Sequence, residues 1–300
     1  MSPKTMSGMV SCFHQAGLPD GVLNTLVHEP ANAPAITAQL IENVNIRKVN
    51  FTGSTAVGRI IARLAGENLK PVLLELGGKA PAIVWEDANL EQAASGCAMG
   101  SFFHAGQICM STERVLVHKN IRAEFEKKFA AAIEKMFPSS DAPPTLITPL
   151  GVEKNRKLVQ DAISKGAGVV SGNPNEADGP NKTTMRPIVL NNVTPEMDIY
   201  KTESFGPTVS LIEVGSEEEA VRIGNDTEYG LTSSVFTEDL RLGLRLARQL
   251  ETGAVHINGM TVHDEATLPH GGTKASGFGR FNSSTGLQEW LKTKNITFKY

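Results

Sequence analysis

The chain has 300 residues, 40% hydrophobic and 20% charged, so it can bury a sizeable core, and its length suggests about two domains. A net charge of -3 at pH 7 supplies no basic surface for nucleic acid, and no apolar run approaches the ~18 residues of a membrane span. Three cysteines without a C-x-x-C pair predict neither a disulfide framework nor a metal site, and with no secretion signal at the N-terminus they favour a reducing, cytoplasmic compartment.

Helical and β-rich stretches alternate in the first third of the chain. Ser2-Pro3 is typical of a helix start and Gly17 of a helix end, which predicts a first helix over residues 3–16. The alternation that follows predicts a parallel α/β sheet. Strands are expected at 21–26, 48–51, 72–74 and 82–85, with helices near 31–43, 55–66 and 89–104.

The rest of the chain continues the same alternation. A stripe of five apolar residues recurs every four positions and predicts a core-facing helix over 121–137. Residues 171–182, rich in Gly, Asn and Pro, are expected to form an exposed loop. Further helices are expected at 152–165, 217–225 and 240–250, and further strands at 168–170, 187–190, 208–212, 232–236 and 254–258.

Small residues mark the end of the expected strand at 48–51. Residues 51–58 read Phe-Thr-Gly-Ser-Thr-Ala-Val-Gly, so Gly53 and Ser54 would open a helix whose free N–H groups favour an anion, with Gly58 in its first turn. We interpret residues 51–58 as a phosphate-binding site. The alternative is an ordinary capped helix that binds nothing, and the spacing is not the G-x-G-x-x-G dinucleotide fingerprint.

Two further segments carry candidate catalytic side chains. Glu75 ends an expected strand before Gly77-Gly78, where open α/β sheets bind their ligands, so it is a candidate general base; alternatively it is a surface residue paired with Lys79. Cys109 follows a glycine-containing break, whereas Cys12 and Cys97 lie in apolar helical patterns. His104 close by suggests a Cys–His protease, but proximity in sequence does not establish a spatial pair.

The order of these motifs is more informative than any one of them. F-T-G-S-T-x-V-G and L-E-L-G-G-K precede F-x-x-x-G-Q-x-C-x-x-x-x-R, and Glu75 precedes Cys109 by 34 residues. The Glu-Ser-Phe-Gly-Pro segment at 203–207 and Pro-His-Gly-Gly-Thr-Lys-Ala-Ser-Gly at 269–277 follow. Together these motifs cover essentially the whole chain, and the chain resembles the aldehyde dehydrogenase family.

The resemblance implies a fold, a reaction and roles for residues. The fold would be α/β, with a partial Rossmann-type cofactor domain over 1–77, an α/β catalytic domain over 78–277, and a C-terminal segment over 278–300 with an oligomerisation strand around 293–298. Cys109 would attack an aldehyde to form a thioester, and Glu75 would activate the hydrolytic water. Glu203 would hold the nicotinamide ribose of NAD or NADP, and Phe205 would help position the nicotinamide ring. Ser54 would meet the pyrophosphate, and Gly53 and Gly58, also cofactor-binding residues, would keep that approach open.

The resemblance also implies a substrate class and a shortened chain. Residues 107–114 look closest to the branch that acts on aromatic aldehydes of the vanillin and salicylaldehyde type, with Phe103 expected to line an apolar pocket. The family's Pro-Trp-Asn-like motif, which supplies an oxyanion donor, and its Lys-Pro-Ser-Glu-like stretch are absent, so an N-terminal truncation and low stability of the bare chain are expected. Two hypotheses follow: a soluble aldehyde oxidiser that forms homo-oligomers as a full chain, or a catalytically silent relative that partners full-length subunits.

Overall fold

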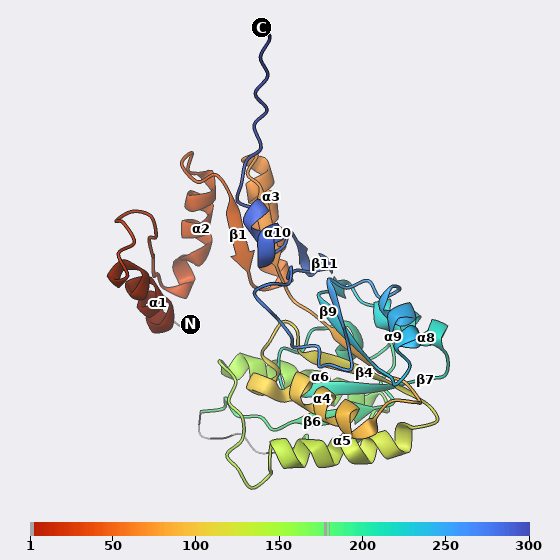
Figure 1. The fold of residues 1–300 in the computed structure, drawn as a ribbon. Coiled ribbons are helices and arrows are strands. Elements are labelled where there is room, and N and C mark those ends of the chain that lie inside the picture. The colour runs from red at the N-terminus through yellow and green to blue at the C-terminus, as the bar shows by residue number, and fades with distance from the viewer. Residues whose placement is uncertain (1–2, 177–178, 180) are drawn as a thin grey trace. The chain divides into compact units, whose positions relative to one another are not determined.

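The computed structural model describes residues 3–176, 179 and 181–300, and the chain divides into two compact units, which we describe separately. The first unit comprises residues up to Val49 together with Ala62–Pro71, and the second comprises Asn50–Ile61 and Val72–Tyr300. Figure 1 colours the chain from its N-terminus in red to its C-terminus in blue. No helix among the described residues is both long and apolar enough to cross a membrane.

The first unit is small and mostly helical. It contains α1 (Pro3–Gln15), a 3-10 helix (Pro30–Asn32) and α2 (Ala33–Glu42), and the division between units falls within β1 (Val49–Thr52) and α3 (Thr55–Glu67). α1 buries none of its residues. The prediction of a strand at 21–26 was wrong. These residues form turns and irregular chain, and Val22 and Leu26 are exposed. A strand needs a neighbour to pair its backbone groups, and no described segment pairs with this one.

The second unit is built on a seven-stranded sheet with the order β10-β9-β3-β4-β7-β6-β5. Neighbouring strands are parallel except for the antiparallel pair β5–β6 at one edge. The expected α/β class is confirmed. The strands are β3 (Ala80–Val84), β4 (Thr112–His118), β5 (Gly168–Ser171), β6 (Ile188–Asn191), β7 (Thr208–Val214), β9 (Thr232–Phe236) and β10 (Ala254–Ile257).

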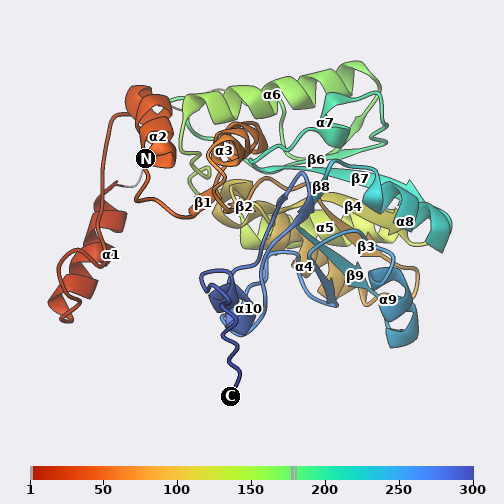
Figure 2. The ribbon, with the colours of Figure 1, turned by 90° about the horizontal axis from the view of Figure 1, so that it is seen from above.

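Helices cover both faces of this sheet because its strands are apolar on both sides. Ala82 and Val84 of β3 join one core cluster, whereas Ile83 between them joins the other. α4 (Leu90–Phe102) and α5 (Arg122–Met136) lie on one face, and α6 (Pro149–Ser164) lies on the other (Figures 1 and 2). α7 (Asp198–Lys201), α8 (Glu217–Asn225) and α9 (Leu240–Ala247) contribute to the α6-side core.

The apolar stripe expected over 121–137 is confirmed as the buried face of α5. Phe125, Phe129 and Ile133 are buried against the sheet, and the Phe125 and Phe129 rings stack with their centroids 5.4 Å apart. The sequence did not indicate β4, because its first residues, Thr112, Glu113 and Arg114, are polar and were not expected in a fully buried strand.

Two smaller sheets connect the C-terminal part of the chain to the region around Glu75. β2 (Val72–Glu75) lies between β1 and β12 (Gly277–Phe278), with Gly277 paired antiparallel to Glu75. β8 (Tyr229–Gly230) pairs with β11 (Thr273–Lys274). The last helix is α10 (Ser283–Gln288). No strand is described around Thr293–Phe298, so the expected oligomerisation strand stays a prediction.

Candidate active site

A cavity of about 590 Å³ opens in the second unit where several chain segments end. The segment after β1, the segment after β2 and the turn before β4 all contribute to its wall. The residues that line it are Thr52, Gly53, Ser54, Glu75, Leu76, Gly77, Gln107, Ile108, Cys109, Lys154, Glu203 and Phe205. Gly58 and Phe103 do not line this cavity.

Cys109 and Glu75 are in direct contact within this cavity. The Sγ–H of Cys109 donates to Glu75 Oε1 at 2.9 Å, and Glu75 is only 6% exposed. Burial raises the pKa of the Cys109 thiol, and the charge and hydrogen bond of Glu75 raise it further. The thiol therefore keeps its proton, and Glu75 Oε1 is placed to accept that proton.

Glu75 is not the surface residue of the alternative interpretation, because Lys79 has another partner. Lys79 Nζ lies 2.5 Å from Glu113 Oε2, and both side chains are almost fully buried. Glu113 also accepts hydrogen bonds from the backbone N–H groups of Ser204 and Phe205, at distances of 2.7–3.0 Å. The buried ion pair thus fixes the loop that carries Glu203 and Phe205 to the start of β4.

Glu203 reaches the cavity over two glycines. Its Oε1 accepts from the Gly78 N–H at 2.9 Å, and a Cβ on Gly77 would lie 2.7 Å from the same oxygen. A Cβ on Gly78 would lie 2.3 Å from the Cys109 carbonyl oxygen. Burial raises the pKa of Glu203, and Glu113 raises it further. Gly77-Gly78 is therefore required so that the Glu203 carboxylate and the Cys109 carbonyl can both approach this backbone.

The turn before Cys109 adopts an unusual backbone conformation. His104 and Ala105 have φ of 50° and 58°, a region that side chains other than glycine rarely adopt. Gly106, at φ 70°, leaves no room for a Cβ against the Gly206 carbonyl. Gln107 holds the turn by donating to the His104 carbonyl at 3.0 Å and by accepting from the Ile147 N–H at 2.9 Å. The His104 ring lies against the Phe103 ring at an interplanar angle of 58°, with ring centroids 4.4 Å apart.

The residues expected at a pyrophosphate site differ in whether they line the cavity. Gly53 and Ser54 line the cavity at the start of α3, and Ser54 Oγ accepts from the Val57 N–H at 3.4 Å as a helix cap. Gly58 instead allows α3 to pack closely against Leu76, because a Cβ at this position would lie 2.6 Å from Leu76 Cδ2.

His270 was not singled out as a site residue from the sequence, although it lies within the quoted 269–277 motif. Its Nε2 lies 3.6 Å from Glu75 Oε1 and its Nδ1 lies 4.0 Å from Asp264 Oδ1. Its contact with Glu75 raises the pKa of His270, although burial opposes the shift. No sequence signal placed it beside Glu75, because that contact depends on the pairing of β12 with β2.

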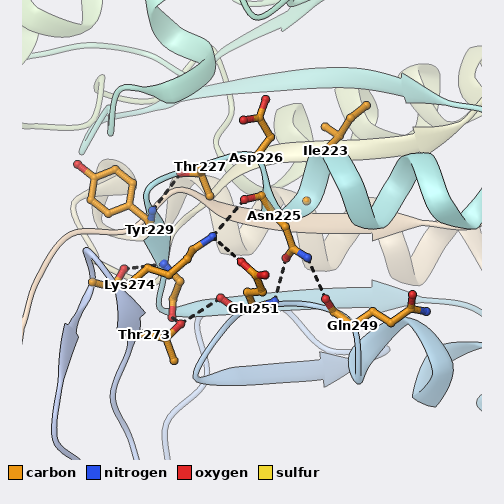
Figure 3. A network of polar contacts seen from close by, with 12 residues as sticks. Ile223, Asn225, Asp226, Thr227, Tyr229, Gln249, Glu251, Thr273 and Lys274 are labelled. Atoms are coloured by element: carbon orange, nitrogen blue, oxygen red, sulfur yellow. Dashed lines mark hydrogen bonds and ion pairs between the residues drawn. The ribbon is translucent and has the colours of Figure 1, made fainter.

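That segment is anchored by polar contacts around the end of α8 (Figure 3). Asn225 donates to the Gln249 carbonyl and accepts from the Glu251 N–H, both at 2.8 Å, and its own carbonyl accepts from Lys274 Nζ at 3.1 Å (Figure 3). Thr273 Oγ1 donates to the Glu251 carbonyl at 3.1 Å. Since β12 begins three residues after Lys274, these contacts hold the strand that pairs with Glu75.

Comparison with known proteins decides the family. The model of the aldehyde dehydrogenase family matches residues 1–296. This chain belongs to the aldehyde dehydrogenase family. The resemblance drawn from the motifs is therefore confirmed.

Several relatives of this aldehyde dehydrogenase chain are named for aromatic aldehyde substrates. A vanillin dehydrogenase of a Pseudomonas species is 40% identical over 304 residues, which cover 100% of this chain and 62% of that protein. A salicylaldehyde dehydrogenase of another Pseudomonas strain is 44% identical over 307 residues, covering 99% of this chain and 62% of that protein.

A solved structure shows the same fold. The salicylaldehyde dehydrogenase from Pseudomonas putida complexed with salicylaldehyde matches with a TM-score of 0.91 at 42% identity, covering 100% of this chain and 63% of that one. The chain thus spans about three fifths of the length of the relatives it matches.

Proposed function

We propose that the protein containing this chain oxidises an aldehyde to a carboxylic acid with NAD or NADP, through a thioester on Cys109. The observation that carries the proposal is the 2.9 Å contact between Cys109 Sγ and Glu75 Oε1 in the wall of the cavity. A nucleophile and a base within hydrogen-bond reach of each other are the signature of covalent catalysis.

Glu75 activates the nucleophile in the first half of the reaction. Because the pKa of the Cys109 thiol is raised, the thiol carries its proton near neutral pH and needs an acceptor. As Sγ bonds to the aldehyde carbon, the thiol proton passes to Glu75 Oε1 and the carbonyl electron pair moves onto the oxygen. The backbone N–H of Cys109 is one donor for that oxygen, and a lost donor of this kind can cost ~10²–10³ in rate.

Glu75 acts again in the second half. The chemistry that a bound nicotinamide supplies is acceptance of the hydride from the tetrahedral carbon, which leaves a thioester on Cys109. Once Glu75 has released its first proton, it takes one from a water molecule. The resulting hydroxide adds to the thioester carbon, and the C–S bond breaks with its electron pair on Cys109 Sγ. The thiolate takes up a proton to restore the thiol, and the acid leaves the cavity.

The cavity wall fits the nicotinamide side of such a cofactor. The Glu203 carboxylate, held by Gly78, is an acceptor suited to ribose hydroxyls, and Gly77 leaves space only because it lacks a Cβ. Phe205 offers an apolar ring, and Ser54 caps a helix start that favours an anion. These residues would hold the cofactor with its hydride-accepting end toward Cys109.

The proposed substrate class is an aromatic aldehyde. Leu76, Ile108 and Phe205 give the cavity an apolar surface near Cys109, and the similarity to vanillin and salicylaldehyde dehydrogenases supports the same choice. Burial of an aromatic ring against these apolar side chains would favour binding of the aldehyde.

The test is a spectrophotometric assay of the 300-residue chain with benzaldehyde or vanillin and either NAD or NADP. The expected result is formation of reduced cofactor that requires Cys109 and is lost in Cys109→Ala. Equal rates in the two proteins would refute the assignment of the nucleophile. No turnover by either protein would favour the second hypothesis, a catalytically silent relative.

A further inference from the structure

His270 occupies a position between the buried nucleophile–base pair and the solvent. Its backbone is fixed by an antiparallel bridge to Phe281, with N–H to carbonyl distances of 3.0 and 2.7 Å. Its side chain is 15% exposed, between Glu75 at 7% and Asp264 at 44%. The exposure of the ionisable side chains therefore rises in order from Glu75 through His270 to Asp264.

The two ring nitrogens of His270 face two different carboxylates. Nε2 lies 3.6 Å from Glu75 Oε1, the same oxygen that accepts the Cys109 thiol, and Nδ1 lies 4.0 Å from Asp264 Oδ1. Both separations are ion-pair distances, slightly longer than a full hydrogen bond. An imidazole that faces an acid on each side can gain a proton at one nitrogen and lose a proton from the other.

Each turnover of the proposed reaction delivers protons to Glu75, first from the thiol and then from water. Glu75 has little access to solvent, and its Oε2 is buried without a hydrogen-bond partner among the described residues. The carboxylate must lose its proton before it can act as a base again. Because Glu75 itself is so little exposed, an adjacent ionisable side chain offers a route by which the proton can leave.

We infer that His270 carries protons from Glu75 toward Asp264 and the solvent, and so acts on the reaction only through Glu75. This inference rests on the proposed function. Nε2 takes the proton from Glu75 Oε1, and Nδ1 releases one toward Asp264 Oδ1 or to water at the protein surface. No oxidation or reduction accompanies the transfer, and Glu75 returns to its carboxylate form.

The charges around His270 define the pH range of this step. Glu75 and Asp264 raise the pKa of His270 from its usual 6.5, whereas burial and Arg280 oppose the shift. His270 must be neutral at Nε2 to accept a proton. Turnover should therefore rise with pH through the pKa of His270, on the alkaline side of 6.5.

The test compares His270→Ala with the wild-type chain over this pH range, with and without added imidazole. We expect kcat to fall by about 10-fold to 100-fold, with the KM for the aldehyde within about twofold. Imidazole should restore kcat, because it can occupy the vacated space and carry the proton. The matched control is His263→Ala: His263 lies in the same segment and pairs with Glu265, and its loss should change neither kcat nor the response to imidazole.

Two kinetic outcomes would overturn the inference. One is a wild-type kcat and pH profile in His270→Ala, and the other is a fall that imidazole does not reverse, since a purely structural role gives no chemical rescue. If His270→Ala does not fold, His270→Gln takes its place: its pH profile must lose the rise that the wild type shows, and a retained rise would overturn the inference.

A second measurement separates this inference from the proposed function. Nuclear magnetic resonance titration of His270 in the full chain needs neither cofactor nor turnover. The pKa of His270 should lie above 6.5 and fall in Glu75→Gln. Absence of turnover by the wild-type chain would refute the proposed function. Independently of that result, an unchanged pKa of His270 in Glu75→Gln would overturn the role of His270.

Discussion

Replacing Glu75 by Gln keeps the size of the side chain but removes its ability to accept a proton. Two effects on Cys109 then oppose each other. The thiol loses its proton acceptor at 2.9 Å, which slows its attack on any electrophile. It also loses a neighbouring negative charge that raises its pKa, which increases the fraction of thiolate.

The magnitudes decide the direction of the net effect. A positioned general base contributes about 10²–10⁴-fold to a proton-coupled step. Loss of the neighbouring charge lowers the thiol pKa and increases the fraction of thiolate, which offsets part of this effect. Burial remains as the largest cause of the raised pKa in the variant. Glu75→Gln should therefore react more slowly than the wild type near neutral pH, by up to the ~10²–10⁴-fold that a general base contributes.

The assay is alkylation of Cys109 by iodoacetamide, followed by mass spectrometry of the intact chain. Cys12 is exposed and is replaced by Ser in every variant, while Cys97 is buried. Glu203→Gln is the matched control, since Glu203 also raises the thiol pKa but does not contact Sγ, so its loss should not slow alkylation. A rate in Glu75→Gln equal to or above that of the wild type would show that Glu75 acts only as a nearby charge.

Three further predictions concern stability and cofactor affinity. Glu113→Ala leaves the buried Lys79 without its partner and should lower the free energy of unfolding by about 3–5 kcal/mol in urea titrations, and a loss below about 1 kcal/mol would contradict the buried pair. Gly77→Ala places a Cβ 2.7 Å from Glu203 Oε1, so the KM for NAD or NADP should rise about tenfold, equivalent to ~1.4 kcal/mol, and an unchanged KM would exclude Glu203 from binding. The raised pKa of His270 stabilises the fold below 6.5, and this contribution is lost as pH rises through the folded value. Relative to His270→Gln, the wild-type melting temperature should therefore decline above pH 6.5, and parallel curves would contradict the Glu75 contact.

Periodicity predicted most of the second unit, because its elements bury regular apolar patterns. The stripe on α5 is one example, and the helix at 217–225 matches α8 residue for residue. The strand β4 escaped notice because the sequence cannot show that Glu113 and Lys79 neutralise each other inside the fold. The strand expected at 21–26 failed for the opposite reason, because an apolar pattern forms a strand only beside a partner.

The site was predicted through motif order and not through the chemistry of single residues. The structure brings Glu75 and Cys109 into contact, and Glu203 and Phe205 line the same cavity, whereas their catalytic and cofactor-binding roles stay predictions. His270 could not be assigned from sequence, since its contact with Glu75 depends on the pairing of segments some 200 residues apart. Spatial neighbours of this kind become visible only when the fold is known.

The proposed thioester on Cys109 can be trapped and identified directly. The chain is mixed with benzaldehyde and NAD or NADP, quenched in acid within one turnover, and digested for mass spectrometry. We predict a benzoyl group on the peptide that contains Cys109, and this group should be absent without cofactor and absent in Cys109→Ala. Reduced cofactor formed by Cys109→Ala at the wild-type rate, or a benzoyl group on a different residue, would contradict it.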